Sequence, residues 1–228
     1  MCGTCGCDED TSRTVVLEQR VLAKNDGLAT GNRDLLRAKR ITLINLMSSP
    51  GSGKTSLLAR TAREFGGAPV AVIGGDQETG LDAARLRESG CPVVQINTGT
   101  GCHLDATTVA DGLRALEPPD GSVVFVENVG NLVCPALFDL GESARVVLAS
   151  VAEGEDKPLK YPHMFRSADL VLLNKIDLLP HLDFDVDRFV EAAAEVNPRA
   201  QVRQLSVSTG RGVDDWYAWL TTQDVSGP

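Results

Sequence analysis

Short apolar runs alternate with amphipathic stretches along most of this chain. Seven runs are long enough for one buried strand each, at 41–47, 70–74, 92–96, 122–127, 144–150, 168–173 and 201–206. Apolar residues recur with helical spacing at 54–65, 81–89, 103–116, 183–196 and 213–221. Strands that are apolar throughout are typical of parallel sheets covered on both faces. The pattern therefore predicts an α/β fold, with a mostly parallel sheet of roughly seven strands flanked by helices.

The first forty residues differ because they contain no strand pattern. Valine and leucine at helical spacing predict a helix over 12–40, which Gly27 and Gly31 are expected to interrupt. The segment before it consists of cysteine, glycine and acidic residues and has too little apolar content to fold alone. We therefore expect four parts: a cysteine-rich metal-binding segment over 1–11, a helical region over 12–40, an α/β domain over 41–222 and a tail over 223–228.

The first predicted strand leads directly into a glycine-rich turn, Ser48-Ser49-Pro50-Gly51-Ser52-Gly53-Lys54-Thr55, and then into a helical pattern. Such a turn is typical of a P-loop NTPase, because glycines let backbone N–H groups converge on the β-phosphate. Lys54 is then a catalytic group that reaches the β- and γ-phosphate oxygens, and Thr55 ligates Mg²⁺. The usual pattern begins with glycine where this chain has Ser48, and serine adopts a positive φ less freely. The predicted phosphate-binding residues are Gly51, Ser52, Gly53, Lys54, Thr55 and Ser56.

A second motif predicts which base is bound. Asn174-Lys175-Ile176-Asp177 directly follows the sixth apolar run. The carboxylate of Asp177 can accept hydrogen bonds from N1–H and the exocyclic amine of guanine, whereas adenine would leave it unpaired. Asn174 can bond the other base edge, and the stem of Lys175 can lie along the ring. The motif therefore favours GTP and GDP over adenine nucleotides.

The loop after the seventh strand is the third candidate nucleotide segment. It reads Ser206-Val207-Ser208-Thr209-Gly210 and resembles the loop that supports guanine in such enzymes. Loops of serine, threonine and glycine are common, so this signal is weaker than the other two. Ser206 and Val207 are its predicted guanine contacts.

Hydrolysis of GTP requires Mg²⁺ and a positioned water, and two further loops supply candidate groups. Asp76 follows the second strand, where its carboxylate can reach the metal or orient the water. Glu127 follows the fourth strand as a Mg²⁺ ligand, direct or indirect, and Gly130 offers an amide near the γ-phosphate. Asp82 is interpreted as a helix cap or as a partner of Arg85. Since no arginine or glutamine stands out as a transition-state residue, we expect a GTPase with slow, switch-like turnover.

Composition limits the partners and the compartment. The 228 residues carry a net charge of −9, which argues against nucleic acid or an anionic membrane as the main partner. No apolar stretch is long enough to span a membrane, and the N-terminus lacks the regions of a secretory signal. Six cysteines in such a chain indicate reduced thiols used for metal, and we therefore expect a cytoplasmic protein.

Two groups of residues are candidate metal ligands. Cys2, Cys5 and Cys7 place three thiolates within six residues, separated by glycines that let the chain wrap one ion. Soft thiolates select nickel, zinc or copper(I) over Mg²⁺. A redox pair is the alternative, but such a pair normally opens a helix in a thioredoxin-like unit.

The second group is Cys102, His103 and Cys134. Two sulfurs and one nitrogen are an incomplete ligand set, which the second copy in a symmetric homodimer would complete. Cys134 follows the segment of Glu127, so both belong to the same edge of the predicted sheet. Cys91 is interpreted as a small buried hydrophobe.

Seven sequence blocks together resemble one family, the nickel-incorporation GTPases of hydrogenase maturation (HypB). They are Met-Cys-x-x-Cys-Gly-Cys, Ser-Ser-Pro-Gly-Ser-Gly-Lys-Thr, Gly-Asp-Gln-Glu-Thr, Gly-x-x-Cys-His-Leu-Asp-Ala, Glu-Asn-Val-Gly-Asn-Leu-Val-Cys-Pro, Glu-Asp-Lys-Pro-Leu-Lys-Tyr-Pro and Asn-Lys-Ile-Asp. The resemblance covers essentially the whole chain. It implies a GTP-dependent metallochaperone that helps load nickel into the large subunit of [NiFe] hydrogenase.

The same resemblance implies partners and metal roles. The partners are the nickel/zinc carrier HypA, the hydrogenase large-subunit precursor, and a second copy in a GTP-favoured dimer. The site matching Cys102, His103 and Cys134 would bind nickel or zinc near the dimer contact, and the site matching Cys2, Cys5 and Cys7 would be the tighter nickel site. Some members carry a His-rich storage tract, but this chain has three histidines, His103, His163 and His181, so storage is not expected.

Other functions explain less of the sequence. A small-molecule P-loop kinase leaves the Asn174–Asp177 motif and both cysteine groups unexplained, and a plain metal-storage protein has no use for a nucleotide site. A urease-type nickel-insertion GTPase is a sister function. The N-terminal cysteines and the Glu-Asp-Lys-Pro-Leu-Lys-Tyr-Pro block favour hydrogenase over urease.

Overall fold

A seven-stranded parallel sheet forms the centre of the molecule. The computed structural model describes residues 8–76, 81–97 and 103–223. The strands are β1 (Thr42–Ser48), β2 (Val70–Asp76), β3 (Val93–Asn97), β4 (Val123–Glu127), β5 (Ala144–Ser150), β6 (Leu170–Asn174) and β7 (Gln201–Gln204). Their spatial order is β3-β2-β4-β1-β5-β6-β7, and every pair is parallel. All seven predicted strands are confirmed, and the sheet is fully rather than mostly parallel.

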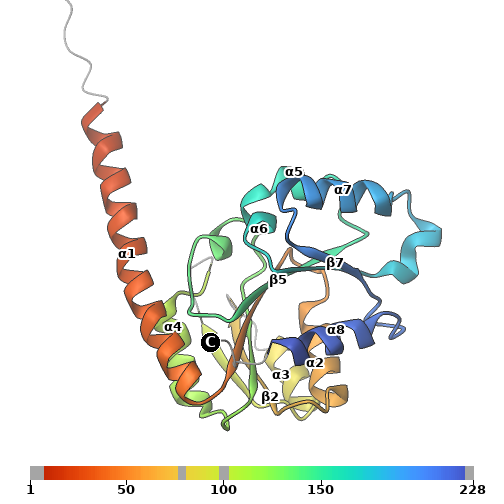
Figure 1. Cartoon of the computed structure of the whole chain (residues 1–228), viewed down its shortest axis with the longest axis horizontal. Coiled ribbons are helices and arrows are strands. Elements are labelled where there is room, and N and C mark those ends of the chain that lie inside the picture. Colours follow the sequence, from red (N-terminus) through yellow and green to blue (C-terminus); the bar gives the residue numbers. More distant parts are fainter. Residues whose placement is uncertain (1–7, 77–80, 98–102, 224–228) are drawn as a thin grey trace, which may run out of the picture.

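Helices follow the strands and cover both faces of the sheet (Figure 1). The longer ones are α1 (Asp8–Ala38), α2 (Lys54–Glu64), α3 (Leu81–Glu88), α4 (Ala106–Leu116), α7 (Val186–Val196) and α8 (Val213–Thr222). Four short helical segments were not predicted: η1 (Cys134–Ala136), α5 (Lys157–Lys160), α6 (Pro162–Arg166) and η2 (Ile176–His181). They are too short to show a helical period in the sequence, and three of them contain proline near the start.

Helix α4 begins at Ala106, three residues later than predicted, because Asp105 caps it. The carboxylate of Asp105 accepts from the Thr108 backbone N–H at 2.8 Å, and the Thr108 hydroxyl accepts from the Asp105 N–H at 2.9 Å. This reciprocal pair satisfies two backbone donors and fixes the first turn. Residues 103–105 are therefore a loop that leads into the helix.

Helix α1 is one continuous helix, so the expected interruption at Gly27 and Gly31 is wrong. Its C-terminal half lies beside α4, and its N-terminal half extends beyond the body of the molecule (Figure 1). Two buried asparagines attach it: Asn25 donates to the Asp139 carbonyl at 2.7 Å, and Asn32 donates to the carbonyls of Ala106 and Leu140, each at 2.9 Å. These tertiary bonds outweigh the weak helix propensity of glycine.

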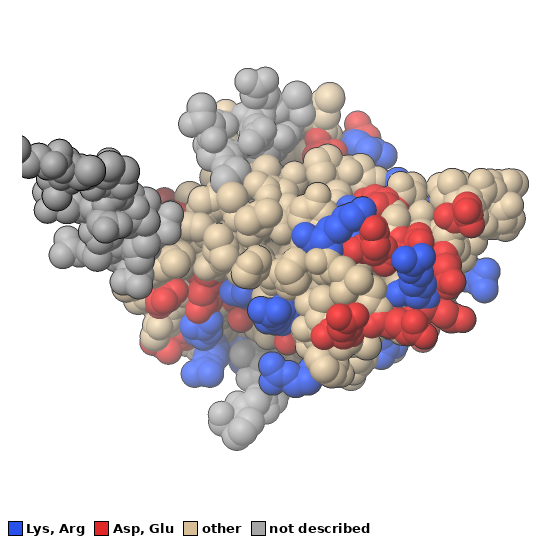
Figure 2. All heavy atoms as spheres, turned by 90° about the horizontal axis from the view of Figure 1, so that it is seen from above, with Lys and Arg blue, Asp and Glu red and all other residues tan. Residues whose placement is uncertain are grey.

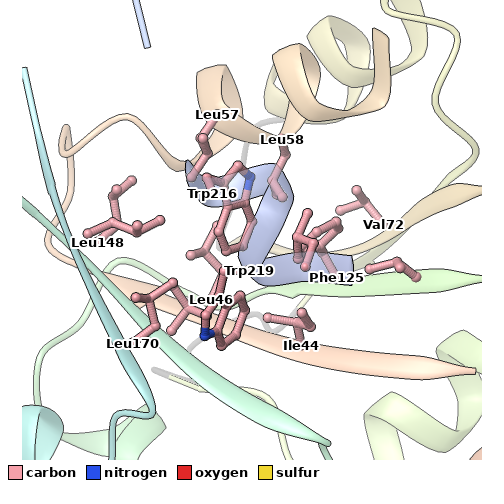
Figure 3. Packing of buried hydrophobic residues seen from close by; sticks show 14 of the residues in the cluster. Ile44, Leu46, Leu57, Leu58, Val72, Phe125, Leu148, Leu170, Trp216 and Trp219 are labelled. Atoms are coloured by element: carbon pink, nitrogen blue, oxygen red, sulfur yellow. The ribbon is translucent and has the colours of Figure 1, made fainter. Parts of the chain in front are cut away.

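Apolar side chains fill both faces of the sheet. One large cluster joins β1, β4, β5 and β6 to α2, α3 and α8, with Trp216 and Phe125 fully buried at its centre (Figure 3). The opposite face carries two separate clusters, one beneath α1 and α4 and one beneath α6 and α7. Because the central strands are buried on both sides, their sequences are mostly apolar, as the strand pattern predicted.

This topology determines where ligands bind. Strand β1 lies between β4 and β5, so the loops that follow these strands meet at one edge of the sheet. Ligands in open parallel sheets sit at the carboxyl ends of the strands, and the predicted motifs follow β1, β2, β4, β6 and β7. None of the helices in the described part of the chain combines the length and apolarity needed to cross a bilayer.

Candidate nucleotide and metal sites

The turn between β1 and α2 has the backbone of a phosphate cradle. Gly51 has a φ of 76° and Gly53 a φ of 105°, a region that residues with a Cβ rarely adopt. A Cβ on Gly53 would also lie 2.7 Å from Asn174 Nδ2. Helix α2 starts immediately afterwards at Lys54, so its first N–H groups and the positive end of its dipole face the same turn.

The structure explains why serine can stand at position 48, where the usual P-loop pattern has glycine. It is the last residue of β1 and does not have a positive φ, so glycine is not required there. Its hydroxyl oxygen accepts from the Lys54 ammonium at 2.8 Å. Burial lowers the pKa of Lys54, although Glu127, Asp82 and Glu153 oppose this effect electrostatically. Little water can reach the Lys54 ammonium. A bound phosphate would give it an anionic hydrogen-bond partner.

The threonine of the P-loop contacts the end of β4. Thr55 Oγ1 donates to Glu127 Oε1 at 2.7 Å, and both side chains are buried. Strands β1 and β4 are neighbours, with Leu46 opposite Glu127, which brings the two groups together. A hydroxyl and a carboxylate are hard oxygen donors of the kind that Mg²⁺ takes, so this pair fits that ion. Asp76 ends β2 one strand further along, and its side chain lies outside the described residues.

A cavity of about 460 Å³ opens in front of these groups. Lys54, Thr55, Glu127 and Gly130 line it, and Gly130 packs so closely that a Cβ there would lie 3.0 Å from Pro50 Cγ. Asp82 and Arg85, on the first turns of α3, line it too. The sequence assigned this pair a purely structural role, but the fold exposes both on the wall of the phosphate cavity.

A second cavity of about 640 Å³ adjoins the first at Gly53, Ser56 and Arg85. Asn174, Lys175, Val207 and Ser208 line its far side, which brings the second and third nucleotide motifs together as the sequence predicted. The two cavities share a wall, as a phosphate site and an adjoining base site must.

Asn174 has a role that the motif alone did not indicate. Its Nδ2 donates to the Ser52 carbonyl at 2.8 Å, and its Oδ1 accepts from the Val207 N–H at 3.1 Å. The side chain therefore ties the P-loop to the 206–209 loop. Lys175 has a φ of 64° and donates to the Gly51 carbonyl at 2.7 Å. A non-glycine residue in this conformation is held by its surroundings, which is common at binding sites.

Asp177 is half-buried and keeps its charge. The Ser206 hydroxyl donates to Asp177 Oδ1 at 2.5 Å, and this hydrogen bond lowers the pKa of the carboxyl below its usual range. The second carboxylate oxygen remains able to accept. Ser206 Oγ also lies 3.0 Å from Ser208 Oγ, so the loop after β7 orients the acidic group.

The sequence did not single out one buried ion pair that supports the P-loop. The ammonium of Lys157, in α5, contacts Ser49 Oγ and the carboxylate of Glu153, and it is almost completely buried. Ser52 Oγ lies 2.5 Å from Glu153 Oε1. The pair thus holds two P-loop serines from the β5 side. In the sequence this ion pair appears only as a Glu and a Lys four residues apart after a buried strand. That spacing is too common to predict a contact.

The structure describes only part of the two cysteine groups. Cys2, Cys5, Cys7 and Cys102 lie outside the described residues, and within the rest no three Cys, His, Asp or Glu side chains form a metal cluster. The His103 ring stacks on Phe138, with ring centroids 3.9 Å apart, so the His103 loop packs against the segment that carries Cys134.

Burial shifts the pKa values of His103 and Cys91 in opposite directions. It lowers the pKa of His103, which keeps the imidazole neutral, the form that binds a metal. Burial raises the pKa of the Cys91 thiol to about 11, which fits its expected role as an unreactive core residue.

Comparison with known proteins identifies the family of this chain. The model of the "CobW/HypB/UreG, nucleotide-binding domain" matches residues 42–204. The hydrogenase maturation factor HypB of Azotobacter vinelandii is 56% identical over 213 residues, which cover 93% of this chain and 70% of that protein. The hydrogenase/urease maturation factor HypB of Helicobacter pylori is 36% identical, covering 92% of this chain and 88% of that protein.

Solved structures agree. The crystal structure of HypB from Helicobacter pylori in complex with nickel superposes with a TM-score of 0.82 at 38% identity, covering 88% of this chain and 94% of that one. The P-loop, the strand order and the extent of these matches lead to the same assignment. This chain belongs to the CobW/HypB/UreG family of nucleotide-binding proteins and, within it, to the HypB hydrogenase maturation factors.

Proposed function

We propose that this chain is a GTP-hydrolysing nickel metallochaperone that assists nickel insertion into [NiFe] hydrogenase. The observation that carries the choice of GTP is the charged Asp177, which accepts from Ser206, the residue before Val207 and Ser208 in the lining of the second cavity. The relative crystallised with nickel supports nickel as the cargo. Zinc remains the alternative ion for either cysteine group, since thiolates and imidazole bind both metals.

In this proposal the described residues divide the work between binding and hydrolysis. The P-loop amides and Lys54 bind the phosphates, and Asn174, Lys175, Asp177, Ser206 and Val207 hold the guanine side. Thr55, Glu127 and Asp76 would hold Mg²⁺, which neutralises negative charge on the phosphate oxygens when bound. Asp76 or Glu127 orients the attacking water, and the Gly130 amide lies on the γ-phosphate side.

The partners follow from the same proposal. HypA would supply nickel, the hydrogenase large-subunit precursor would receive it, and a homodimer favoured by GTP or metal would complete the ligand set of Cys102, His103 and Cys134. We place these events in the cytoplasm. Nucleic acid is not a proposed partner, because the net charge is −9 and the face in Figure 2 mixes acidic with basic side chains.

The urease-type function remains the second candidate. The relative from Helicobacter pylori is named a hydrogenase/urease maturation factor, so one protein can carry both names. The two functions use the same nucleotide and metal groups and differ in the acceptor protein. Nickel transfer to purified hydrogenase precursor and to purified urease apoprotein would separate them.

A double substitution tests whether tight nickel binding can be removed without loss of GTP hydrolysis. Cys2→Ala with Cys5→Ala is expected to abolish the tightest nickel site, since one remaining thiolate cannot hold the ion, and to leave GTP hydrolysis within about twofold of the unsubstituted protein. Nickel is measured by competition with a chromophoric chelator under reducing conditions. Cys91→Ala, at a buried thiol, is the control. Unchanged nickel affinity in the double variant would remove these cysteines from the metal site.

A further inference from the structure

Two buried asparagines join the nucleotide segment to the loop of His103. Asn45 lies in the middle of β1, and Asn128 directly follows Glu127 at the end of β4; both side chains are almost completely buried. Asn128 Nδ2 donates to Asn45 Oδ1 at 3.2 Å. Asn128 Oδ1 accepts from the Leu104 N–H at 3.3 Å, and Leu104 is the residue after His103.

The hydrogen bonds fix which way each amide points. Asn128 Oδ1 accepts from two backbone donors, Leu104 N–H and Val129 N–H, the latter at 3.0 Å. The oxygen must therefore face them, and Nδ2 must face Asn45. Asn45 then has to present its own oxygen, which leaves Asn45 Nδ2 with no hydrogen-bond partner among the described residues. Buried donors are rarely left in this way, so the position calls for an explanation.

The pair also interrupts the apolar packing. Asn45 points to the same face of the sheet as Leu43 and Met47, because side chains alternate along a strand. Leu43 belongs to the cluster beneath α1 and α4, and Met47 to the cluster beneath α6 and α7. The asparagines therefore lie in the seam between two cores, where an apolar pair would pack without an unsatisfied donor.

We infer that Asn128, anchored by Asn45, is a positioning residue that transmits the nucleotide state to the His103 loop. This inference rests on the proposed function and names the part of the chain that couples its two sites. Asn128 lies between two groups at the phosphate cavity: Glu127, which contacts Thr55, and Gly130, which packs on Pro50.

The hydrogen bonds of Asn128 connect the phosphate cavity to the His103 loop. A change of the phosphates that shifts residues 127–130 must shift or rotate the Asn128 amide with them. The amide holds Leu104 N–H, so the movement reaches the loop before α4 through one bond. If both amides turn, Asn128 Oδ1 can accept from Asn45 Nδ2, which gives the pair a second hydrogen-bonded arrangement.

The test compares nickel affinity in the two nucleotide states. For the weaker nickel site, that of Cys102, His103 and Cys134, calorimetry under reducing conditions gives the ratio of Ni²⁺ dissociation constants with GDP and with GTPγS, which is the coupling factor. We expect a factor of at least about fivefold in the unsubstituted protein. In Asn128→Ala and in Asn45→Ala the factor is expected to fall to within about twofold of unity. Asn128 lines the phosphate cavity whereas Asn45 lines neither cavity, so Asn45→Ala is the variant expected to change GTPγS affinity by less than about threefold.

A matched control separates coupling from stability. Asn197 is also buried and donates through Nδ2 to the carbonyls of Phe165, Arg166 and Ala168, away from both cavities. Asn197→Ala removes a comparable set of bonds and is expected to retain the full coupling factor. If Asn128→Ala retains it as well, the inference is wrong.

A conservative variant distinguishes a loss of coupling from poor folding of the alanine variants. In Asn128→Asp the carboxylate still accepts from Leu104 and Val129, and the Asn45 amide can flip so that Nδ2 donates to it. This variant keeps the bonds to Leu104 and Val129 through which the coupling is proposed to run, so a folded protein is expected to retain the coupling factor. Coupling that is lost in folded Asn128→Asp as well as in Asn128→Ala would overturn the inference.

Amide hydrogen exchange provides a readout without metal. The exchange rate of Leu104 N–H is expected to differ between the GDP and GTPγS forms by about tenfold or more, and this difference should vanish in Asn128→Ala. Equal rates in both forms of the unsubstituted protein would refute the relay while leaving the proposed function standing. A protein that binds neither GTPγS nor Ni²⁺ would refute the proposed function as well.

Discussion

Asp177→Asn is expected to lower GTP affinity by roughly 100-fold or more and to create affinity for xanthosine triphosphate. In the proposed function the carboxylate would accept from two guanine donors, and an amide would present a donor to one of them, which replaces attraction with a clash of hydrogens. Xanthine has an oxygen in place of the exocyclic amine, so it matches the amide. The Ser206 hydroxyl, which lies 2.5 Å from Asp177 Oδ1, can still hold the side chain in place.

Calorimetric titration with GTP, xanthosine triphosphate and ATP measures this change. Asp183→Asn is the matched control, because Asp183 is an exposed carboxylate on the same stretch of chain and lies outside the Asn174–Asp177 and Ser206–Gly210 motifs. Its nucleotide affinities should equal those of the unsubstituted protein. Undiminished GTP affinity in Asp177→Asn would show that the base lies elsewhere.

Lys54→Ala is the second substitution with a large expected effect. The Lys54 side chain is half-buried, and we place its ammonium at the β- and γ-phosphates, where charge-assisted hydrogen bonds are strong. Its loss is expected to cost roughly 3 kcal/mol of GTP binding, more than about 100-fold, and to abolish measurable hydrolysis. Phosphate release with saturating GTP and the dissociation constants of GTP and GDP are the measurements.

The control for Lys54→Ala is Lys39→Ala, which removes an exposed ammonium at the end of α1. Circular dichroism must show that both variants are folded, since Lys54 also donates to Ser48. Nucleotide binding that survives in folded Lys54→Ala would contradict the phosphate assignment.

The strands and the nucleotide motifs could be predicted because their signals are local. A buried parallel strand is apolar throughout, and a P-loop needs Gly51 and Gly53 for their backbone conformation and Lys54 for its charge. The order of strands in a parallel sheet then brings the separate motifs to one edge. The motifs thus carried enough information to predict where the cavities would lie.

Contacts between distant segments could not be predicted. Glu153 and Lys157 support the P-loop through side-chain bonds to residues about a hundred positions earlier, and no period in the sequence marks such a contact. Asn45 is a polar residue within the predicted strand 41–47, and its bond joins it to Asn128 in a segment 83 positions later. Helix α1 remains continuous through two glycines because of tertiary bonds at its C-terminal half, which outweigh propensity.

The central claim is that guanine nucleotide and nickel bind one scaffold and influence each other. Calorimetric titration of the full chain with GTPγS under reducing conditions, with and without saturating Ni²⁺, tests it most directly. We expect GTPγS to bind tightly, with a dissociation constant that Ni²⁺ shifts by about fivefold or more. In a parallel titration, the adenine analogue ATPγS is expected to show negligible binding. Identical GTPγS dissociation constants in the two titrations would contradict the account.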